Sequence, residues 1–378
     1  MSTTSKKPSV FIAGVGEVGR YLLEFLVRDE LEIDIIAADV DLKSLEAKVN
    51  NAVIGAALHN KHPSVTALEL DLFDVARTAE ILQKRRPDVV INCAVLQTWH
   101  VIRRLPEEVY TRLSSAGLGA WLPVQLPLAM KLAQAIQAAE IQPHFINTSL
   151  SDLTNPTLKG GGLSPTIGIG NVALIEPAVR TLVSRKLNLP RSEVSLKMVA
   201  HHVHWVLWRE AGYREGAPYF MKITANGENV TGQFDTLKLM KEAILLYSSG
   251  TSFSAVSASS TLQNLKALLS KEVVNLHSPG PNGLPGGYPI AMNAKGVEVD
   301  LPEEISLDEA IRLNKEAHTY DGVQEIEENG RVHFTSYTIE VMKEMLGFDC
   351  ESFTLEECEN LGKEQIRRFK ELEQRYRS

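Results

Sequence analysis

Residues 9–28 read SVFIAGVGEVGRYLLEFLVR. A short apolar run is followed by the loop Gly14-Val15-Gly16-Glu17-Val18-Gly19 and then by an amphipathic stretch. This order predicts a strand, a tight turn and a helix. In such a turn the first glycine permits the bend, the second lets the backbone approach a pyrophosphate, and the third lets helix and strand pack closely. We therefore expect phosphates to bind at the start of the helix, where backbone N–H groups are unpaired.

A carboxylate follows the next predicted strand. The strand at 33–38 ends at Asp39, twenty residues after Gly19. A carboxylate at this position accepts hydrogen bonds from the adenosine ribose and repels a 2′-phosphate, which favours NAD over NADP. The alternative is a glycine-rich turn that binds no ligand.

Strands and helices alternate through the first 150 residues. Strands are expected at 65–70, 87–94 and 143–148, and helices at 75–85 and 126–140. This alternation predicts an α/β domain, residues 1–150, with a doubly wound parallel sheet of the Rossmann type. Because ligands bind at the carboxyl ends of such strands, Asp71, Leu72 and Ala94 join the expected NAD site.

The alternation stops after residue 150. Residues 151–171 are rich in glycine, proline and small polar residues. Beyond them we expect helices at 172–186, 234–247, 254–271, 307–319 and 354–375, and strands at 194–207 and 219–225. Asn226-Gly227 is typical of a hairpin, and strand pairs are expected around 293–296 and 328–330. The sequence thus predicts a second, α+β substrate and catalytic domain at 151–378 that ends in a helix.

Composition limits the classes of partner. The 378 residues carry a net charge of −8, and the charges are mixed along the chain. No basic face of the kind that nucleic acid requires is indicated. The three cysteines lack disulfide or zinc spacing, and neither a signal segment nor a membrane-spanning run is present. We expect a cytoplasmic protein whose partner is a small-molecule substrate, without nucleic acid or membrane.

A cluster of histidines is the main catalytic candidate. His201, His202 and His204 fall in the predicted strand 194–207. Residues two apart share one face of a strand, so His202 and His204 are expected to point together and His201 away from them. Two imidazoles facing a cleft suit acid–base work or a metal, and the alternative is a pair of core histidines. We favour acid–base chemistry and expect no metal, because no cysteine or clear carboxylate ligand accompanies them.

A second candidate follows the strand at 87–94. The segment 97–104 begins where a nicotinamide is expected, and it contains His100, Arg103 and Arg104. A guanidinium fork suits a carboxylate or phosphate, so Arg103 is a candidate for holding an anionic substrate. The alternative is a solvated charged segment.

Two resemblances extend this interpretation. The run Asp71-Leu72-Phe73-Asp74, together with RPDVVINCA at 86–94, resembles extended short-chain reductases such as dTDP-4-dehydrorhamnose reductase. In that family the Asp-Leu pair lies by the adenine. The family also carries a catalytic Tyr-x-x-x-Lys pair, which this sequence lacks. Only cofactor binding is therefore carried over.

The second resemblance covers most of the chain. Ile146-Asn147-Thr148, a glycine/proline stretch, IGIGN at 167–171, a long helix and a histidine-bearing strand follow in the order found in the lactate/malate dehydrogenase and family 4 glycosidase superfamily. The resemblance implies that Asn147 lies by nicotinamide and substrate and that Asn171 lies near the histidines. It also implies a homo-oligomer. Gly170 stands where the glycosidases have a metal-binding cysteine, and His202 falls near their metal-binding histidine.

These observations favour one function and leave two others open. The leading hypothesis is an NAD-dependent oxidoreductase that transfers hydride from a hydroxyl carbon of a small polar or anionic substrate, such as a hydroxy acid or sugar acid. His202 or His204 would take the hydroxyl proton. The alternatives are an NAD-dependent glycosidase, lyase or epimerase with internal redox cycling and no net NADH, and a non-catalytic NAD(H)-binding sensor.

Overall fold

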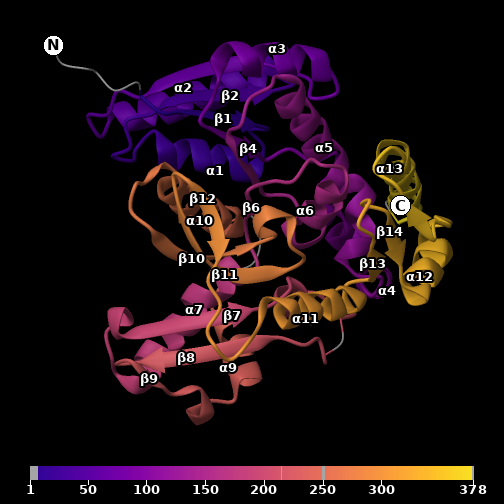
Figure 1. The fold of residues 1–378 in the computed structure, drawn as a ribbon. Coiled ribbons are helices and arrows are strands. Elements are labelled where there is room, and N and C mark those ends of the chain that lie inside the picture. The colour runs from indigo at the N-terminus through magenta and orange to yellow at the C-terminus, as the bar shows by residue number, and fades with distance from the viewer. Residues whose placement is uncertain (1–6, 214, 249–251, 377–378) are drawn as a thin grey trace.

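The computed structural model describes residues 7–213, 215–248 and 252–376 (Figure 1). The first half of the chain contains one parallel sheet, with the strand order β3-β2-β1-β4-β5-β6. The strands are β1 (Ser9–Ala13), β2 (Asp34–Asp39), β3 (Ser64–Glu69), β4 (Val89–Asn92), β5 (His144–Asn147) and β6 (Ile167–Gly168). The order reverses between β1 and β4, and this point is where doubly wound sheets bind ligands. The predicted Rossmann sheet is therefore confirmed.

Helices cover both faces of the sheet because alternate strand residues point to opposite sides. Val10 and Ile12 pack in one core with α1 (Glu17–Leu26) and α2 (Leu42–Ala57). Phe11 and Ala13 pack in the other core with α3 (Val75–Arg85) and α5 (Leu122–Ala138). Short helices η1 (Trp99–Arg104), α4 (Glu107–Ser114) and η2 (Leu118–Trp121) connect β4 to α5.

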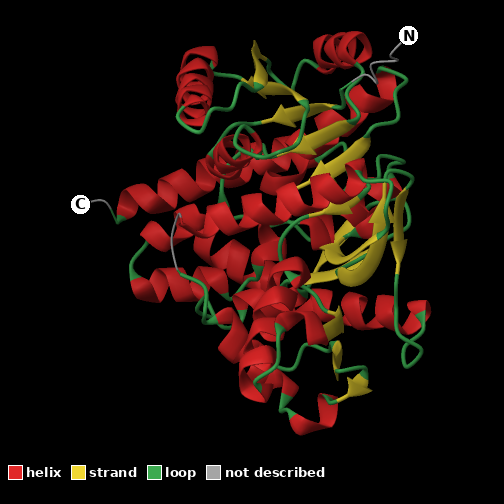
Figure 2. Ribbon diagram, turned by 90° about the vertical axis from the view of Figure 1, so that its left-hand side faces the viewer, coloured by secondary structure: helices red, strands yellow, loops and turns green. Residues whose placement is uncertain are grey.

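The second half holds three small antiparallel sheets, with helices around them (Figure 2). Their strands are β7 (Val194–Val199), β8 (Phe220–Ala225) and β9 (Glu228–Asn229); β10 (Val274–Pro279), β11 (Gly287–Asn293) and β12 (Gly296–Val299); and β13 (Val323–Ile326), β14 (Val332–Phe334) and β15 (Ser352–Phe353). The helices are α6 (Ser151–Gly160), α7 (Val172–Leu187), η3 (Arg191–Glu193), α8 (Val203–Val206), η4 (Thr231–Gln233), α9 (Thr236–Ile244), α10 (Ser252–Leu269), η5 (Pro281–Gly283), α11 (Leu307–Tyr320), α12 (Ser336–Leu346) and α13 (Cys358–Arg375). The α/β sheet followed by an α+β half agrees with the sequence prediction.

The division at residue 150 is less sharp than the sequence indicated. β6 pairs with β5 through Ile146–Ile167 and Asn147–Gly168, so the parallel sheet extends past that boundary. At the other end of the chain, α13 lies beside α5 (Figure 1), and Gln365 donates a hydrogen bond to the carbonyl of Ala120. The last helix therefore packs against the first domain.

The predicted strand 194–207 is wrong in its second half. β7 ends at Val199, and Val203–Val206 form the short helix α8 with His202 at its N-cap. The apolar residues of this segment misled the prediction because short apolar runs fit strand and helix equally. Within the part of the chain that the structure describes, no helix has the length and apolarity needed to cross a membrane.

Candidate active site

A cavity of about 790 Å³ lies at the carboxyl ends of β1, β2 and β4. Its wall includes most of the residues expected to bind a dinucleotide, namely Gly14, Gly16, Glu17, Val18, Asp39, Asp71, Leu72 and Ala94. Gly19, the remaining member of that set, does not line the cavity, and it packs against the carbonyl group of Gly14. The sequence therefore located the cavity from a single strand–turn–helix pattern.

Each glycine of the loop has a distinct steric role. Gly14 has φ +88°, and a Cβ there would lie 2.8 Å from Ala94. A Cβ on Gly19 would lie 2.1 Å from the carbonyl oxygen of Gly14, so helix and turn touch at this residue. A Cβ on Gly16 would meet no atom within 4 Å, because this residue faces the cavity. The space in front of Gly16 lets a ligand reach the backbone.

The start of α1 suits a pyrophosphate. The N-cap residue of α1 is Gly16, and no side chain in the described parts of the chain caps the first N–H groups of this helix. Unpaired N–H groups and the helix dipole together favour an anion there. The Asp39 carboxylate, at the end of β2, accepts a hydrogen bond of 2.7 Å from the N–H of Val15, which ties it to the loop. Loop, carboxylate and cavity together fit a nicotinamide dinucleotide.

A second, smaller cavity of about 190 Å³ continues from the first. The two cavities share six wall residues: Val18, Trp99, His100, Thr148, Leu150 and Ser254. The smaller cavity is also lined by Asn171, His202, Arg103 and Arg209. The expected cofactor site therefore opens directly onto a compartment that holds three of the five catalytic candidates.

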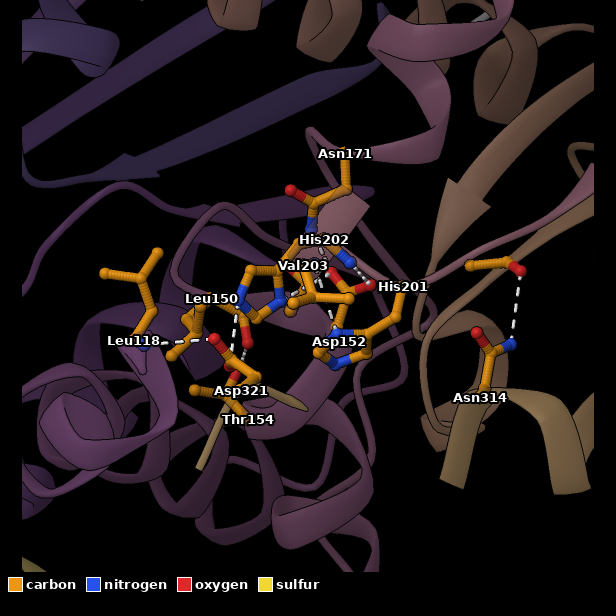
Figure 3. Close-up of polar contacts among 12 residues, drawn as sticks. Leu118, Leu150, Asp152, Thr154, Asn171, His201, His202, Val203, Asn314 and Asp321 are labelled. Carbon is orange, nitrogen blue, oxygen red and sulfur yellow. Dashed lines mark hydrogen bonds and ion pairs between the residues drawn. The ribbon is translucent and has the colours of Figure 1, made fainter. Parts of the chain in front are cut away.

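His202 lies between two carboxylates (Figure 3). Its Nε2 atom is 2.9 Å from Oδ2 of Asp321, and its Nδ1 atom is 3.9 Å from Oδ2 of Asp152. All three side chains are buried, with exposed fractions of 0–1%. Both ring nitrogens are buried, and among the described residues neither makes a hydrogen bond of good geometry, so the contacts with the two carboxylates are treated as ion pairs.

These carboxylates decide the protonation of His202. Burial alone would lower the pKa of His202, because it disfavours the charged imidazolium. The charges of Asp321 and Asp152 outweigh burial, and the pKa lies above its ordinary value of 6.5. Burial also raises the pKa of Asp152 to about 6, although His202 and Asn171 act against this shift. The site holds groups that exchange protons near neutral pH, as acid–base catalysis requires.

Asp152 is fixed on both sides. One carboxylate oxygen accepts a hydrogen bond of 3.1 Å from the backbone N–H of His202, and the other accepts one from the side chain of Asn171. Asn171 has φ 49° and ψ −115°, a conformation that costs a non-glycine residue about 1–3 kcal/mol. Strain of this kind concentrates at functional sites. Asn171 therefore positions Asp152, which in turn contacts His202.

Two catalytic candidates do not reach the cavities, and these predictions are corrected. His204 points away from His202, and its ring contacts the carbonyl of Pro218 at 3.2 Å. The predicted alternation failed because β7 ends at Val199 and the chain turns into α8, and the rings of His201 and His202 lie 4.3 Å apart. Asn147 is fully buried and lines neither cavity. It joins β5 to α6 through hydrogen bonds to Thr154 and Asn155.

Arg103 lines the smaller cavity, but its guanidinium is already occupied. It forms a two-pronged ion pair with Glu210, and its charge lies over the ring of Trp99 at 4.9 Å. The expected role of a free anion-binding fork is therefore corrected. Arg209 also faces the cavity, and its three hydrogen bonds go to the backbone carbonyls of residues 244, 247 and 248. Its positive charge has no carboxylate bonded to it among the described residues.

Sequence reasoning missed Asp152 and Asp321. Asp152 lies in the first turn of α6, within a stretch whose glycines and prolines suggested a loop. Asp321 caps the end of α11, 119 residues after His202 in the chain. One Asp321 oxygen accepts a hydrogen bond of 3.0 Å from the N–H of Leu118, which holds the other oxygen toward His202. No local sequence signal connects these positions.

Comparisons with known proteins agree with this geometry. Residues 10–100 match the family model described as the saccharopine dehydrogenase NADP binding domain. No curated protein matches the chain. Among solved structures, the lactate dehydrogenase of Eimeria maxima with NADH and oxamate is 17% identical with a TM-score of 0.57, over 84% of this chain and 92% of that one. The chain has the lactate/malate dehydrogenase fold.

Two further solved structures support the same fold. The apo malate dehydrogenase of Picrophilus torridus is 18% identical with a TM-score of 0.57, over 84% of this chain and 98% of that one. The lactate dehydrogenase of Cryptosporidium parvum, in complex with lactic acid and nicotinamide adenine dinucleotide, is 14% identical with a TM-score of 0.57, over 84% and 99% of the two chains. The suspected resemblance to these dehydrogenases is therefore confirmed at the level of fold.

Proposed function

We propose that this chain is an NAD-dependent oxidoreductase that removes hydride from the hydroxyl carbon of a small anionic substrate, with His202 as the proton acceptor. The observation that carries the proposal is the continuity of the two cavities. The glycine-loop cavity opens onto a compartment walled by His202, Asn171 and Arg209. A substrate in the smaller cavity therefore lies next to a dinucleotide in the larger one, as hydride transfer requires.

The cofactor would be held by groups already described. The N–H groups at the start of α1 would bind the pyrophosphate, and Asp39 would bind the adenosine ribose. Bound nicotinamide supplies the hydride acceptor. NAD is favoured over NADP because a 2′-phosphate beside the Asp39 carboxylate would be repelled, although the matching family model is named for NADP.

His202 would exchange the proton. A neutral imidazole removes the hydroxyl proton, and the imidazolium that forms is stabilised by Asp321 and Asp152. Because the pKa of His202 is raised, its imidazolium persists to a higher pH than that of an ordinary histidine and can donate a proton in the reverse reaction. Oxidation should accordingly speed up as the pH rises through this pKa, and carbonyl reduction should slow down.

The size and charge of the compartment favour a small acid. A volume of about 190 Å³ holds roughly six groups the size of a water molecule, at ~30 Å³ each. Arg209 supplies a positive charge without a bonded carboxylate among the described residues, and a guanidinium suits a substrate carboxylate. A short 2-hydroxy acid meets both conditions.

The test is NADH formation by purified protein with a panel of 2-hydroxy acids and sugar acids. We expect turnover with a short 2-hydroxy acid, and a loss of at least 100-fold in kcat for His202→Gln. His204→Gln is the matched control, because His204 is equally buried but lines neither cavity. Equal turnover by wild type and His202→Gln, with both folded, would overturn the proposed role of His202. Failure to bind NAD or NADP by calorimetry would overturn the function as a whole.

A further inference from the structure

A third cavity, of about 720 Å³, lies apart from the site described above. It is enclosed by the end of α6, the turn after η5, the last turns of α11, and β13 with the residues that follow. It shares no wall residue with the two active-site cavities. Its volume lies in the range of roughly 300–1,000 Å³ that small-molecule sites occupy. We name it the rear chamber.

Close backbone packing fixes the walls of the rear chamber. A Cβ on Gly160 would lie 2.0 Å from the backbone nitrogen of Gly330. Gly283 has φ +72°, and a Cβ there would lie 2.6 Å from the Cβ of Lys159. Side chains at either glycine would push these segments apart. The chamber is thus formed in advance of any ligand, which reduces the entropic cost of binding.

Opposite charges line the chamber without pairing. Lys159 and Lys315 contribute ammonium groups, and Glu325 and Glu328 contribute carboxylates; all four residues are exposed and stand at the solvent-facing rim of the chamber. In the described parts of the chain none of these four has an ion-pair partner within 4.0 Å, whereas Glu327, in the same wall, pairs with His333 at 2.6 Å. Charges of both signs that share a chamber and stay apart fit a ligand that carries both charges.

Another part of the wall is apolar. Leu284, Pro285, Ile311 and Ile326 line the chamber and are mostly withdrawn from solvent. Apolar walls with a few charged groups are typical of small-ligand sites. A zwitterion with an aliphatic side chain satisfies the charged groups and covers this surface.

We propose that the rear chamber binds an α-amino acid with an apolar side chain. Lys159 and Lys315 hold its carboxylate, and Glu325 and Glu328 hold its ammonium group. This binding site does not depend on the proposed oxidoreductase function.

A line of buried imidazoles connects the rear chamber to the active site. His318, on α11, lines the chamber and is 2% exposed, and its Nε2 atom has no hydrogen-bond partner. Its ring lies 5.0 Å from that of His201, which lies 4.3 Å from that of His202. The backbone N–H of Asp321 also donates to the carbonyl of His318. Figure 3 shows His201, His202 and Asp321 together at the active-site end of this line. A ligand in the chamber would therefore touch a residue of the same helix whose end holds Asp321.

The experiment is calorimetric titration of the full chain, without nicotinamide or substrate, with L-leucine, 4-methylpentanoate and 3-methylbutylamine. The last two lack the ammonium and the carboxylate, respectively. We expect L-leucine binding to saturate at one molecule per chain. 4-Methylpentanoate and 3-methylbutylamine should each bind at least tenfold more weakly than L-leucine. The substitutions Lys315→Met and Glu325→Gln should each weaken the binding of L-leucine at least tenfold. The control Lys271→Met, at an exposed lysine outside the chamber, should bind as wild type does.

Three results would overturn the proposal. The first is the absence of saturable L-leucine binding. The second is binding of 4-methylpentanoate as tight as that of L-leucine, because the glutamates would then not hold an ammonium group. The third is unchanged binding by Lys315→Met and Glu325→Gln, because the ligand would then lie elsewhere. Histidine NMR provides a further readout, since L-leucine should shift a ring signal that His318→Gln abolishes. Because no cofactor is present, failure here is distinct from failure of the oxidoreductase proposal.

Discussion

Replacing Asp321 by Asn should lower the pKa of His202 substantially. Asn keeps an oxygen for the N–H of Leu118 and removes only the negative charge 2.9 Å from the His202 ring. Two unit charges about 4 Å apart, at an effective dielectric of about 20, interact by about 4 kcal/mol, which corresponds to about 3 pKa units. Neighbouring opposite charges typically shift a pKa by about 1–3 units. Asp152, 3.9 Å away, remains, so we expect a fall of about 1–3 units.

The assay is the pH dependence of kcat/KM for hydroxy-acid oxidation. Wild-type activity should rise through a midpoint above 6.5, because the neutral imidazole is the active form and the pKa of His202 is raised. In Asp321→Asn the midpoint should move down by about 1–3 pH units. Titration of the His202 ring by NMR measures the same shift without turnover. The control is Asp349→Asn, which removes a surface ion pair with Lys343. A midpoint and ring titration unchanged in Asp321→Asn would refute the electrostatic argument.

Three further predictions concern the cofactor and the effect of acid. Asp39→Ser should weaken NAD binding and narrow its preference over NADP, as measured by the ratio of the two dissociation constants; an unchanged ratio would show that Asp39 does not contact the ribose. Gly19→Ala should abolish dinucleotide binding or lower stability by about 1–3 kcal/mol in chemical denaturation, because its Cβ would lie 2.1 Å from the Gly14 carbonyl; normal binding and stability would contradict this packing. Burial lowers the pKa of His277 to about 3. As the pH falls below 6.5, His277 is therefore protonated in the unfolded state but not in the folded state, and the free energy of unfolding decreases. His277→Gln should reduce the pH dependence of the unfolding free energy by about 1 kcal/mol per pH unit between pH 5.5 and 6.5, and an unchanged slope would count against a neutral, buried His277.

The sequence predicted the first half well because its determinants are local. A glycine loop between an apolar strand and an amphipathic helix has one structural solution, and the acid at the end of the next strand, Asp39, follows from it. The long helix α2 was not predicted, since exposed apolar residues such as Ile54, and Leu58 just past its end, blur the helical pattern. Pro156 hid α6 for a different reason, because it is the sixth residue of this ten-residue helix and proline is disfavoured in a helix interior.

The candidate site was only half predictable. His202 was identified because three histidines in four residues are conspicuous, but its carboxylate neighbours come from α6 and from the end of α11. Only the folded chain brings Asp152 and Asp321 to one imidazole. Arg103 was misjudged for a similar reason, since its partner Glu210 lies 107 residues away. Contacts between distant segments decide which charged side chains remain available.

The distribution of the site along the chain has a consequence for how activity is acquired during synthesis. The glycine loop and nearly the whole wall of the larger cavity come from residues 13–150, with Ser254 as the exception. The imidazole and its carboxylates come from residues 152, 202 and 321. A nascent chain therefore completes nearly the whole wall of the larger cavity long before His202 acquires both charged neighbours. A chain that ended shortly before Asp321 would keep every residue of the larger cavity wall and lack one of the two carboxylates beside His202.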